Sequence, residues 1–211
     1  MSFPDFARYR LFLEHDLAEG VRLPLEREQA NYLLNVLRMK QDDTVLVFNG
    51  RDGEWLAAIS AEGRKQASLS LVKQTRQQPP APDLHYLFAP LKHARLDYIA
   101  QKAVEMGAGV IQPVLTRRTQ VSRLNFDRMR ANAIEAAEQC GILSLPDIRS
   151  EQALDAALAG LEPGRLLVFC DEAMAQESPV AALSGREPGP LAVLIGPEGG
   201  FDEAERRRIL A

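Results

Sequence analysis

A proline-rich segment divides this chain into two stretches with different sequence patterns. Residues 77–82 read QQPPAP, and three prolines in four residues cannot continue a helix or a central strand. We therefore predict one domain over residues 1–76, a linker over 77–82 and a second domain over 83–211. A chain of 211 residues, 46% of them apolar, is long enough for one large domain or two small ones.

The first stretch has the pattern of short strands joined by tight turns. Apolar runs at Thr44–Phe48, Glu54–Ile59 and Ala67–Val72 are interrupted by Asn-Gly and Asp-Gly pairs, which are typical of hairpin turns. One helix is expected over Glu26–Met39, because its apolar residues share one face. These are Ala30, Leu33, Leu34 and Leu37. We predict a small β-barrel that this helix plugs or flanks.

The second stretch alternates between strand and helix patterns. Strands are expected at Leu84–Ala89, Val110–Leu115, Leu166–Phe169 and Leu191–Ile195, and helices at Arg95–Met106, Phe126–Cys140, Ala153–Leu161 and Asp202–Leu210. This alternation predicts an α/β domain with a mostly parallel sheet and helices on both faces. Ligands bind such sheets beyond the carboxyl ends of the strands.

The last predicted strand runs directly into a glycine-rich turn, GPEGGF at residues 196–201. Three glycines and a proline allow a sharp bend and let a ligand approach the backbone closely. The turn is neither GxGxxG nor a phosphate loop ending in Gly-Lys-Ser/Thr. A plain tight turn is the alternative, but its place after an apolar strand favours a site for a small polar molecule.

Composition and charge narrow the class of protein. No apolar run approaches the roughly 18 residues of a membrane span, and the charged N-terminus is unlike a signal peptide, so the cytoplasm is expected. The two cysteines, Cys140 and Cys170, lack metal-ligand spacing and are expected to be buried free thiols; no metal is predicted. Net charge is −4, yet residues 83–130 carry 8 basic against 4 acidic side chains. The positive excess is therefore local.

Several blocks of sequence, in order along the chain, carry a family resemblance. IGPEGGF resembles the cofactor loop of the SPOUT methyltransferases, and within them the family that methylates N3 of a uridine in 16S ribosomal RNA of the small subunit. Similar blocks are NYLLNVLR at 31–38, FNG at 48–50, LK at 91–92, QKAVEMG at 101–107 and EAAEQCG at 135–141, with Pro113, Arg118 and Pro146.

The resemblance implies a PUA-like, RNA-binding barrel followed by an α/β-knot domain, whose chain is threaded into a trefoil knot. It implies that S-adenosylmethionine is the cofactor, bound within the knot, and that the protein is a homodimer whose two subunits complete each site. It places cofactor-binding residues at Leu194, Ile195, Gly196, Pro197, Glu198, Gly199 and Gly200. Glu198 would orient the cofactor or bond nearby backbone N–H groups.

Three features depart from the family pattern. The family continues past this glycine loop to a motif of the type LGxRILRxETA, whereas this chain stops at Ala211, so we expect a truncated C-terminal end. Arg117 stands where the family tends to have Glu, and Ile142 stands where it has Arg.

The chemistry of this reaction suggests roles for particular residues. Loss of the uracil N3 proton develops negative charge on O2 and O4, which a cation stabilises. Arg118 is one candidate for this catalytic role, with Lys92 and Arg95 as further candidates; a solvated phosphate contact is the alternative for each. Glu138 and Gln139 are candidates for orienting a base or capping a loop, or they belong to the exposed face of a helix.

Basic residues along the chain predict the RNA-binding surface. We expect phosphate contacts from Arg8, Arg10, Arg38, Lys40, Lys92 and Arg95. A different class of function remains open, in which the barrel binds RNA and the second domain only dimerises, as a non-catalytic ribosome-assembly module.

Overall fold

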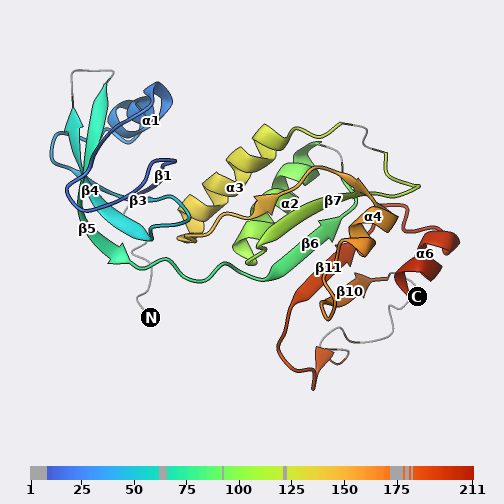
Figure 1. The fold of residues 1–211 in the computed structure, drawn as a ribbon. Helices are drawn as coiled ribbons and strands as arrows, with labels where there is room; N and C mark the ends of the chain where they lie inside the picture. The colour runs from blue at the N-terminus through green and yellow to red at the C-terminus, as the bar shows by residue number, and fades with distance from the viewer. Residues whose placement is uncertain are drawn as a thin grey trace. The chain divides into compact units, whose positions relative to one another are not determined.

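The chain divides into two compact units (Figure 1). The structure is a computed structural model and describes residues 9–61, 66–91, 93–120, 123–171, 178, 181 and 183–211. Unit 1 comprises Met1–Pro80 and Ala137–Leu145, and unit 2 comprises Ala81–Ala136 and Pro146–Ala211. Unit 1 is therefore built from two separate stretches of the chain. In the described residues, no helix is both long enough and apolar enough to cross a membrane.

Unit 1 is built on a five-stranded sheet with the order β1-β3-β4-β5-β2. The strands are β1 (Arg10–Phe12), β2 (Arg22–Pro24), β3 (Thr44–Phe48), β4 (Glu54–Ala61) and β5 (Ala67–Arg76). β1 and β3 are parallel, and the other neighbours are antiparallel. In the turn between β3 and β4, the Asn49 side-chain oxygen accepts the backbone N–H groups of Arg51 and Asp52. The predicted strands and this turn are confirmed.

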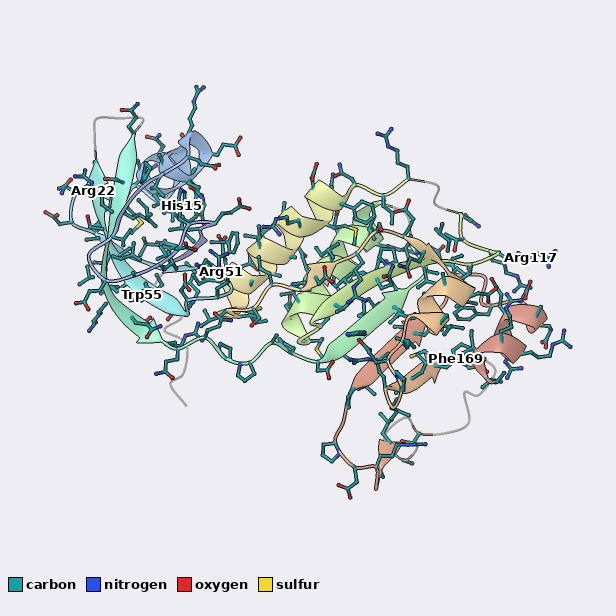
Figure 2. The ribbon with its side chains drawn as sticks, in the orientation of Figure 1. His15, Arg22, Arg51, Trp55, Arg117 and Phe169 are labelled. Atoms are coloured by element: carbon teal, nitrogen blue, oxygen red, sulfur yellow. The ribbon has the colours of Figure 1, made fainter. Side chains whose placement is uncertain are left out.

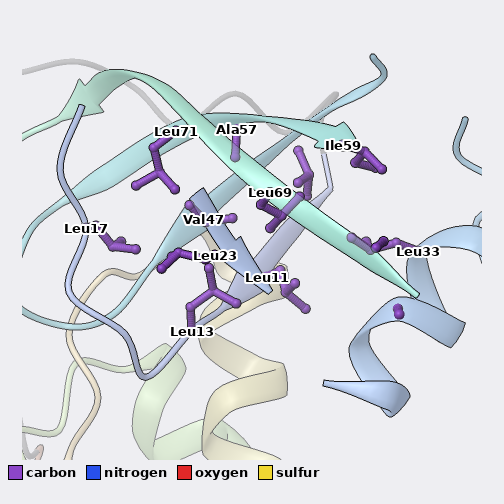
Figure 3. Close-up of a cluster of buried hydrophobic side chains, with 13 residues drawn as sticks. Leu11, Leu13, Leu17, Leu23, Leu33, Val47, Ala57, Ile59, Leu69 and Leu71 are labelled. Carbon is purple, nitrogen blue, oxygen red and sulfur yellow. The ribbon is translucent and has the colours of Figure 1, made fainter. Parts of the chain in front are cut away.

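Apolar side chains from the strands converge on one cluster (Figure 3). Leu11, Val47, Ile59 and Leu69 are at most 5% exposed. Leu33, from the helical segment, completes the cluster and is fully buried. The sheet and the amphipathic helix therefore share one core, as the periodicity predicts.

The prediction of one regular helix over Glu26–Met39 is wrong. The structure has a short α1 (Arg27–Asn31) followed by a π-helical turn η1 (Tyr32–Val36). The Leu37 N–H donates to the Tyr32 carbonyl, five residues back, and Arg38 then takes a left-handed φ of 57°. This wider turn and abrupt stop keep Leu33 in the core while Leu34, Leu37 and Met39 pack against its edge.

The second stretch of unit 1, residues 137–145, is tied to the sheet by polar contacts. The Glu138 carboxylate accepts the Phe12 N–H at 2.8 Å, and the Arg76 guanidinium donates to the Gly141 carbonyl at 2.9 Å. The Gln78 amide donates to the Ser144 hydroxyl at 3.1 Å. These bonds connect residues more than 60 positions apart in the sequence.

A buried ion network lies in the same unit. The Glu54 side chain is 2% exposed and accepts bonds from Arg10 at 3.1 Å and Arg76 at 2.7 Å. Burial alone would raise the pKa of Glu54, but the hydrogen bonds from Arg76 and Thr75 hold it below its ordinary value. Arg10 is itself only 2% exposed in its side chain, so the expectation that it contacts RNA phosphates is wrong.

Unit 2 is an α/β layer structure around a six-stranded sheet. The strands are β6 (Leu84–Phe88), β7 (Val110–Leu115), β8 (Asp147–Ile148), β9 (Gln152–Ala153), β10 (Leu166–Cys170) and β11 (Leu191–Ile195). The helices are α2 (His93–Glu105), α3 (Phe126–Cys140), whose last turn is part of unit 1, α4 (Leu154–Ala159) and α6 (Glu203–Ile209). All strand pairs are parallel, in the order β10-β11-β6-β7-β8, with β9 also paired to β7. The predicted α/β class is confirmed.

Helices lie on both faces of this sheet (Figure 1). α2 and α3 lie together, joined by bonds from Arg128 and Asn132 on α3 to Asp97 on α2. On the other face α4 packs Leu154 and Ala157 against Leu87, Val114 and Leu194. The parallel register pairs Cys170 with Ile195, Ile195 with Phe88 and Phe88 with Pro113, which brings four strand ends to one edge.

Candidate functional site

The glycine-rich turn begins where β11 ends at this edge. Ile195 is the last strand residue, and its carbonyl accepts the Ala89 N–H at 2.9 Å. The turn closes with a bond from the Gly200 N–H to the Pro197 carbonyl at 2.9 Å, and Gly200 takes a left-handed φ of 66°. A side chain at position 200 would be strained in that conformation.

Gly196 has a different reason to lack a side chain. A Cβ there would lie 2.5 Å from Cε2 of the Phe201 ring and 2.9 Å from Cδ2. Phe201 in turn packs edge-on against Phe169 of β10, with ring centroids 5.2 Å apart, and joins the core beneath α4. The turn therefore folds back onto itself because Gly196 leaves room for the ring.

A pocket of about 510 Å³ opens between this turn and its neighbours in unit 2. It is lined by Arg118, Cys170, Asp171, Ile195, Gly196, Pro197, Glu198, Gly200, Phe201, Glu203 and Arg206. Its volume falls in the range of about 300–1,000 Å³ that small-molecule sites occupy. Its lining combines bare backbone with apolar and charged side chains, which suits a ligand that has both apolar and charged parts.

The loop after β7 supplies one wall of the pocket. The Arg118 guanidinium donates to the Gly199 carbonyl at 2.5 Å and lines the pocket. The Arg117 backbone N–H donates to the Glu205 carboxylate at 2.7 Å, and the Arg117 guanidinium contacts Asp202 at 3.1 Å. Figure 2 shows Arg117 beside α6. The β7 loop and the segment 199–205 are therefore held together by three polar contacts.

Charged pairs surround the opening. On one side Arg206 of α6 donates to the Asp171 carboxylate at 2.7 Å, and Asp171 directly follows β10. On another, Arg95 of α2 pairs with Glu198 of the turn at 2.7 Å, with both side chains largely exposed. An exposed pair of this kind exchanges readily with water or a ligand.

Cys170 corrects the expectation of two buried thiols. It is exposed at the carboxyl end of β10 and lines the pocket, while Cys140 is half-buried. Partial burial raises the pKa of the Cys170 thiol, so it stays protonated near neutral pH.

Most of the residues predicted to bind a cofactor surround the pocket. Ile195, Gly196, Pro197, Glu198 and Gly200 line it. Gly199 contributes its carbonyl to Arg118, and Leu194 points into the core with no exposed surface. The sequence did not predict four other lining residues, Cys170, Asp171, Glu203 and Arg206. Two of them follow the predicted strand Leu166–Phe169, but the sequence does not show that this strand lies beside β11.

The residues predicted to be catalytic fall in different units. Arg118 lines the pocket of unit 2. Glu138 and Gln139 belong to unit 1, where Glu138 is engaged with the Phe12 N–H and Gln139 is exposed. Of the residues predicted to bind RNA, Arg38, Lys40 and Arg95 are exposed, Arg10 is buried as described above, and Arg8 and Lys92 lie outside the described residues.

Within the described part of the chain, no three His, Cys, Asp or Glu side chains are grouped so that they could hold a metal ion.

Two family matches cover both units. Residues 77–211 match the RNA methyltransferase domain, and residues 25–72 match the RNA methyltransferase PUA domain. The PUA match covers α1, η1, β3, β4 and most of β5 of unit 1, and the methyltransferase match contains every residue that lines the pocket.

Similar proteins span most of the chain. The ribosomal RNA small subunit methyltransferase E of Rickettsia conorii is 29% identical over 93% of this chain and 80% of its own length. The protein of the same name from Bacillus subtilis is 24% identical over 95% and 84%. A solved structure from Legionella pneumophila, assigned as a methyltransferase and in complex with the bound cofactor SAM, is 27% identical, covers 95% of this chain and 84% of that one, and has a TM-score of 0.78. The predicted family and fold are confirmed: since the methyltransferase match alone spans more than half of its residues, this chain belongs to the RNA methyltransferase family.

Proposed function

We propose that this protein transfers a methyl group from S-adenosylmethionine to N3 of a uridine in 16S ribosomal RNA. The observation that carries the proposal is the pocket built on the Gly196 turn, with Arg118 in its wall. The family membership and the names of the relatives support an RNA methyltransferase of the small ribosomal subunit. The Legionella structure supports S-adenosylmethionine as the cofactor.

The residues of the pocket fit this cofactor. Its volume is large enough for a small molecule, and two of its lining residues, Gly196 and Gly200, have no side chain. Ile195 and Phe201 offer apolar surface, whereas Asp171, Glu198 and Glu203 offer carboxylates for hydroxyl and ammonium groups. When bound, S-adenosylmethionine supplies an electrophilic methyl group on a sulfonium.

Arg118 is the catalytic residue that the geometry supports best. Its guanidinium stays positively charged and is held at the pocket by the Gly199 carbonyl. A cation placed there stabilises the negative charge that spreads onto uracil O2 and O4 when N3 loses its proton. Glu138 and Gln139 stay predictions, and the carboxylates that line the pocket are further candidates for receiving that proton.

Unit 1 binds the RNA in this proposal. Arg38 and Lys40 are exposed at the end of the η1 segment and offer cations to phosphates, and Arg95 offers another on unit 2. Residues 1–76 then serve recognition, and residues 83–211 serve catalysis. From the family resemblance we further propose a homodimer and the trefoil knot.

Calorimetry and a methyl-transfer assay test the proposal. The protein is titrated with S-adenosylmethionine and then incubated with the labelled cofactor and with small subunits or 16S RNA that lack N3-methyluridine, followed by mass mapping of the product. We expect binding and one new N3-methyluridine. Arg118→Gln should lower kcat by about 100-fold or more, whereas Arg207→Gln, an exposed change on α6 outside the pocket lining, should not.

Absence of cofactor binding by the wild-type protein would refute the proposal. RNA binding with no methyl transfer would favour the non-catalytic assembly module instead.

A further inference from the structure

Glu205 is a buried carboxylate whose two oxygens serve two different partners. The residue lies on α6 and is only 4% exposed. Oε2 accepts the Asp202 N–H at 3.1 Å, and Oε1 accepts the Arg117 N–H at 2.7 Å. Burial of a charged carboxylate is costly unless hydrogen bonds compensate it, so both contacts matter to the site.

The first contact is local and needs only one oxygen. It forms the capping box of α6, in which the Asp202 side chain accepts the Glu205 N–H in return. The capping box of α1 in the same chain uses Gln29 at the equivalent position, and its amide oxygen accepts the Glu26 N–H at 3.1 Å. A glutamine therefore suffices for capping, and the second oxygen of Glu205 has a separate role.

The second contact reaches the loop after β7, 88 positions away in the sequence. This loop is closed by a bond from the Thr119 N–H to the Thr116 carbonyl at 3.1 Å, and by the Thr116 N–H to the Thr119 hydroxyl at 2.9 Å. Arg117 stands inside this turn, immediately before Arg118. Fixing the Arg117 N–H therefore fixes the backbone from which the Arg118 side chain extends.

The other two contacts between this loop and the segment 199–205 hold the loop backbone less firmly. The pair between Arg117 and Asp202 spans 3.1 Å, and the Arg117 side chain is 79% exposed. Solvent screens such a pair, and long side chains lose rotamer freedom on forming it. The Gly199 carbonyl accepts its bond from the Arg118 guanidinium, so this bond does not hold the Arg118 backbone. The Glu205 bond differs from both, because it ends on a buried side chain and holds the Arg117 backbone directly.

We propose that Glu205 is a positioning residue for Arg118. Through the Arg117 N–H it holds the β7 loop against α6, so that the Arg118 guanidinium stands in the pocket wall before substrate arrives. This inference rests on the proposed function, in which Arg118 stabilises the charge that develops on uracil. Its consequence is that a residue outside the pocket lining controls kcat through the protein backbone.

Glu205→Gln tests this with little change in shape. The amide oxygen keeps the capping bond to Asp202, as Gln29 does on α1, and the amide NH₂ that replaces the other oxygen cannot accept the Arg117 N–H. We expect kcat to fall about 10-fold to 100-fold, as misplacement of a catalytic group by about 1 Å does. The Kd of Glu205→Gln for S-adenosylmethionine should differ from the wild-type value by no more than the Kd of Arg118→Gln does. Arg207→Gln, on the same helix and exposed, is the matched control and should keep the wild-type kcat.

A double-mutant cycle separates positioning from general structural damage. If Glu205 acts through Arg118, then adding Glu205→Gln to Arg118→Gln lowers kcat by less than about 2-fold further. Independent effects would multiply instead, and that result would overturn the proposal. So would a Glu205→Gln enzyme with wild-type kcat, while an inactive wild-type protein would count against the proposed function and not against this inference.

Amide hydrogen exchange gives a second readout that does not depend on activity. The Arg117 N–H should lose protection by about 10-fold or more in Glu205→Gln, while the Asp202 N–H keeps its protection. Unchanged protection at Arg117 would overturn the proposal. If Glu205→Gln fails to fold, the same measurements apply to Glu205→Asp, which keeps the charge but withdraws the carboxylate from Arg117 by one methylene.

Discussion

Substitution of Gly196 by alanine should disturb the pocket through a single ring. The new Cβ would lie 2.5, 2.9 and 3.2 Å from three carbons of Phe201, and Gly196 itself takes no left-handed φ. The problem is therefore contact and not backbone strain. The ring has to retreat by about 1 Å to reach ordinary van der Waals distance, and this disturbs its packing against the core cluster beneath α4.

The cost can be worked from what that retreat disrupts. Overpacking of a core site costs about 1–3 kcal/mol. Loosening of the edge-on pair between Phe201 and Phe169 adds a part of the roughly 0.5–1.5 kcal/mol that such pairs contribute. We expect Gly196→Ala to lower the free energy of unfolding by about 2–4 kcal/mol, and to weaken cofactor binding because the turn shifts with the ring.

Gly199→Ala is the matched control in the same turn. A Cβ at Gly199 would meet Arg118 Cδ at 3.5 Å, which is ordinary contact, so unfolding should change by no more than about 0.5 kcal/mol. Both variants are measured by denaturant unfolding and by calorimetry with S-adenosylmethionine. Phe201→Leu should partly restore the Gly196→Ala variant, because the smaller side chain removes the clashing ring carbons. Equal stability of Gly196→Ala and wild type, or strict additivity with Phe201→Leu, would refute this reasoning.

Two further predictions concern unit 1. Glu54→Gln removes the carboxylate that pairs with the buried Arg10 and the partly buried Arg76, and should cost about 3–5 kcal/mol in denaturant unfolding. The pKa of Glu54 is lowered in the folded state, so its ionised carboxylate stabilises the fold fully above the ordinary carboxyl pKa of about 4.3. This stabilisation is lost as the pH falls further, through the folded-state pKa. The free energy of unfolding, measured from pH 7 down to 3, should therefore show a decrease in the wild-type protein that Glu54→Gln lacks. Arg38→Gly should raise stability by about 1 kcal/mol, since glycine accepts the left-handed φ of 57°, while Arg38→Ala should not; both should weaken RNA binding equally.

Local sequence patterns predicted the elements well where packing agrees with them. The helix Phe126–Cys140 and the strand Thr44–Phe48 have the predicted bounds, because their apolar periodicity matches the faces they bury. The segment 26–39 departed from a regular helix at the π-helical turn η1, in which Leu33 is buried while Leu34 and Leu37 pack against the core cluster. Propensity yielded there to tertiary packing.

The glycine turn, Glu198 and Arg118 of the candidate site were predicted from the sequence, but the side chains that β10 and α6 contribute were not. The glycine turn after an apolar strand marks a ligand site through local chemistry alone. The contributions of Asp171 and Arg206 depend on β10 lying beside β11, which is a matter of strand order. Arg10 was predicted to be exposed because it is a basic residue near the N-terminus. The sequence does not show that Glu54, 44 positions away, pairs with it in a buried position.

The divided make-up of unit 1 bears on how the chain folds as it is synthesised. Met1–Pro80 leaves the ribosome first, but Glu138, which accepts the Phe12 N–H, and Gly141, whose carbonyl accepts one bond from the Arg76 guanidinium, belong to Ala137–Leu145. At about 5–20 residues per second, those partners follow several seconds later. Until then, the polar groups of the N-terminal sheet that bond to Ala137–Leu145 stay hydrated. That segment is synthesised only after Ala81–Ala136 of unit 2. We therefore expect unit 1 to complete its fold only after Ala81–Ala136 of unit 2 have been synthesised.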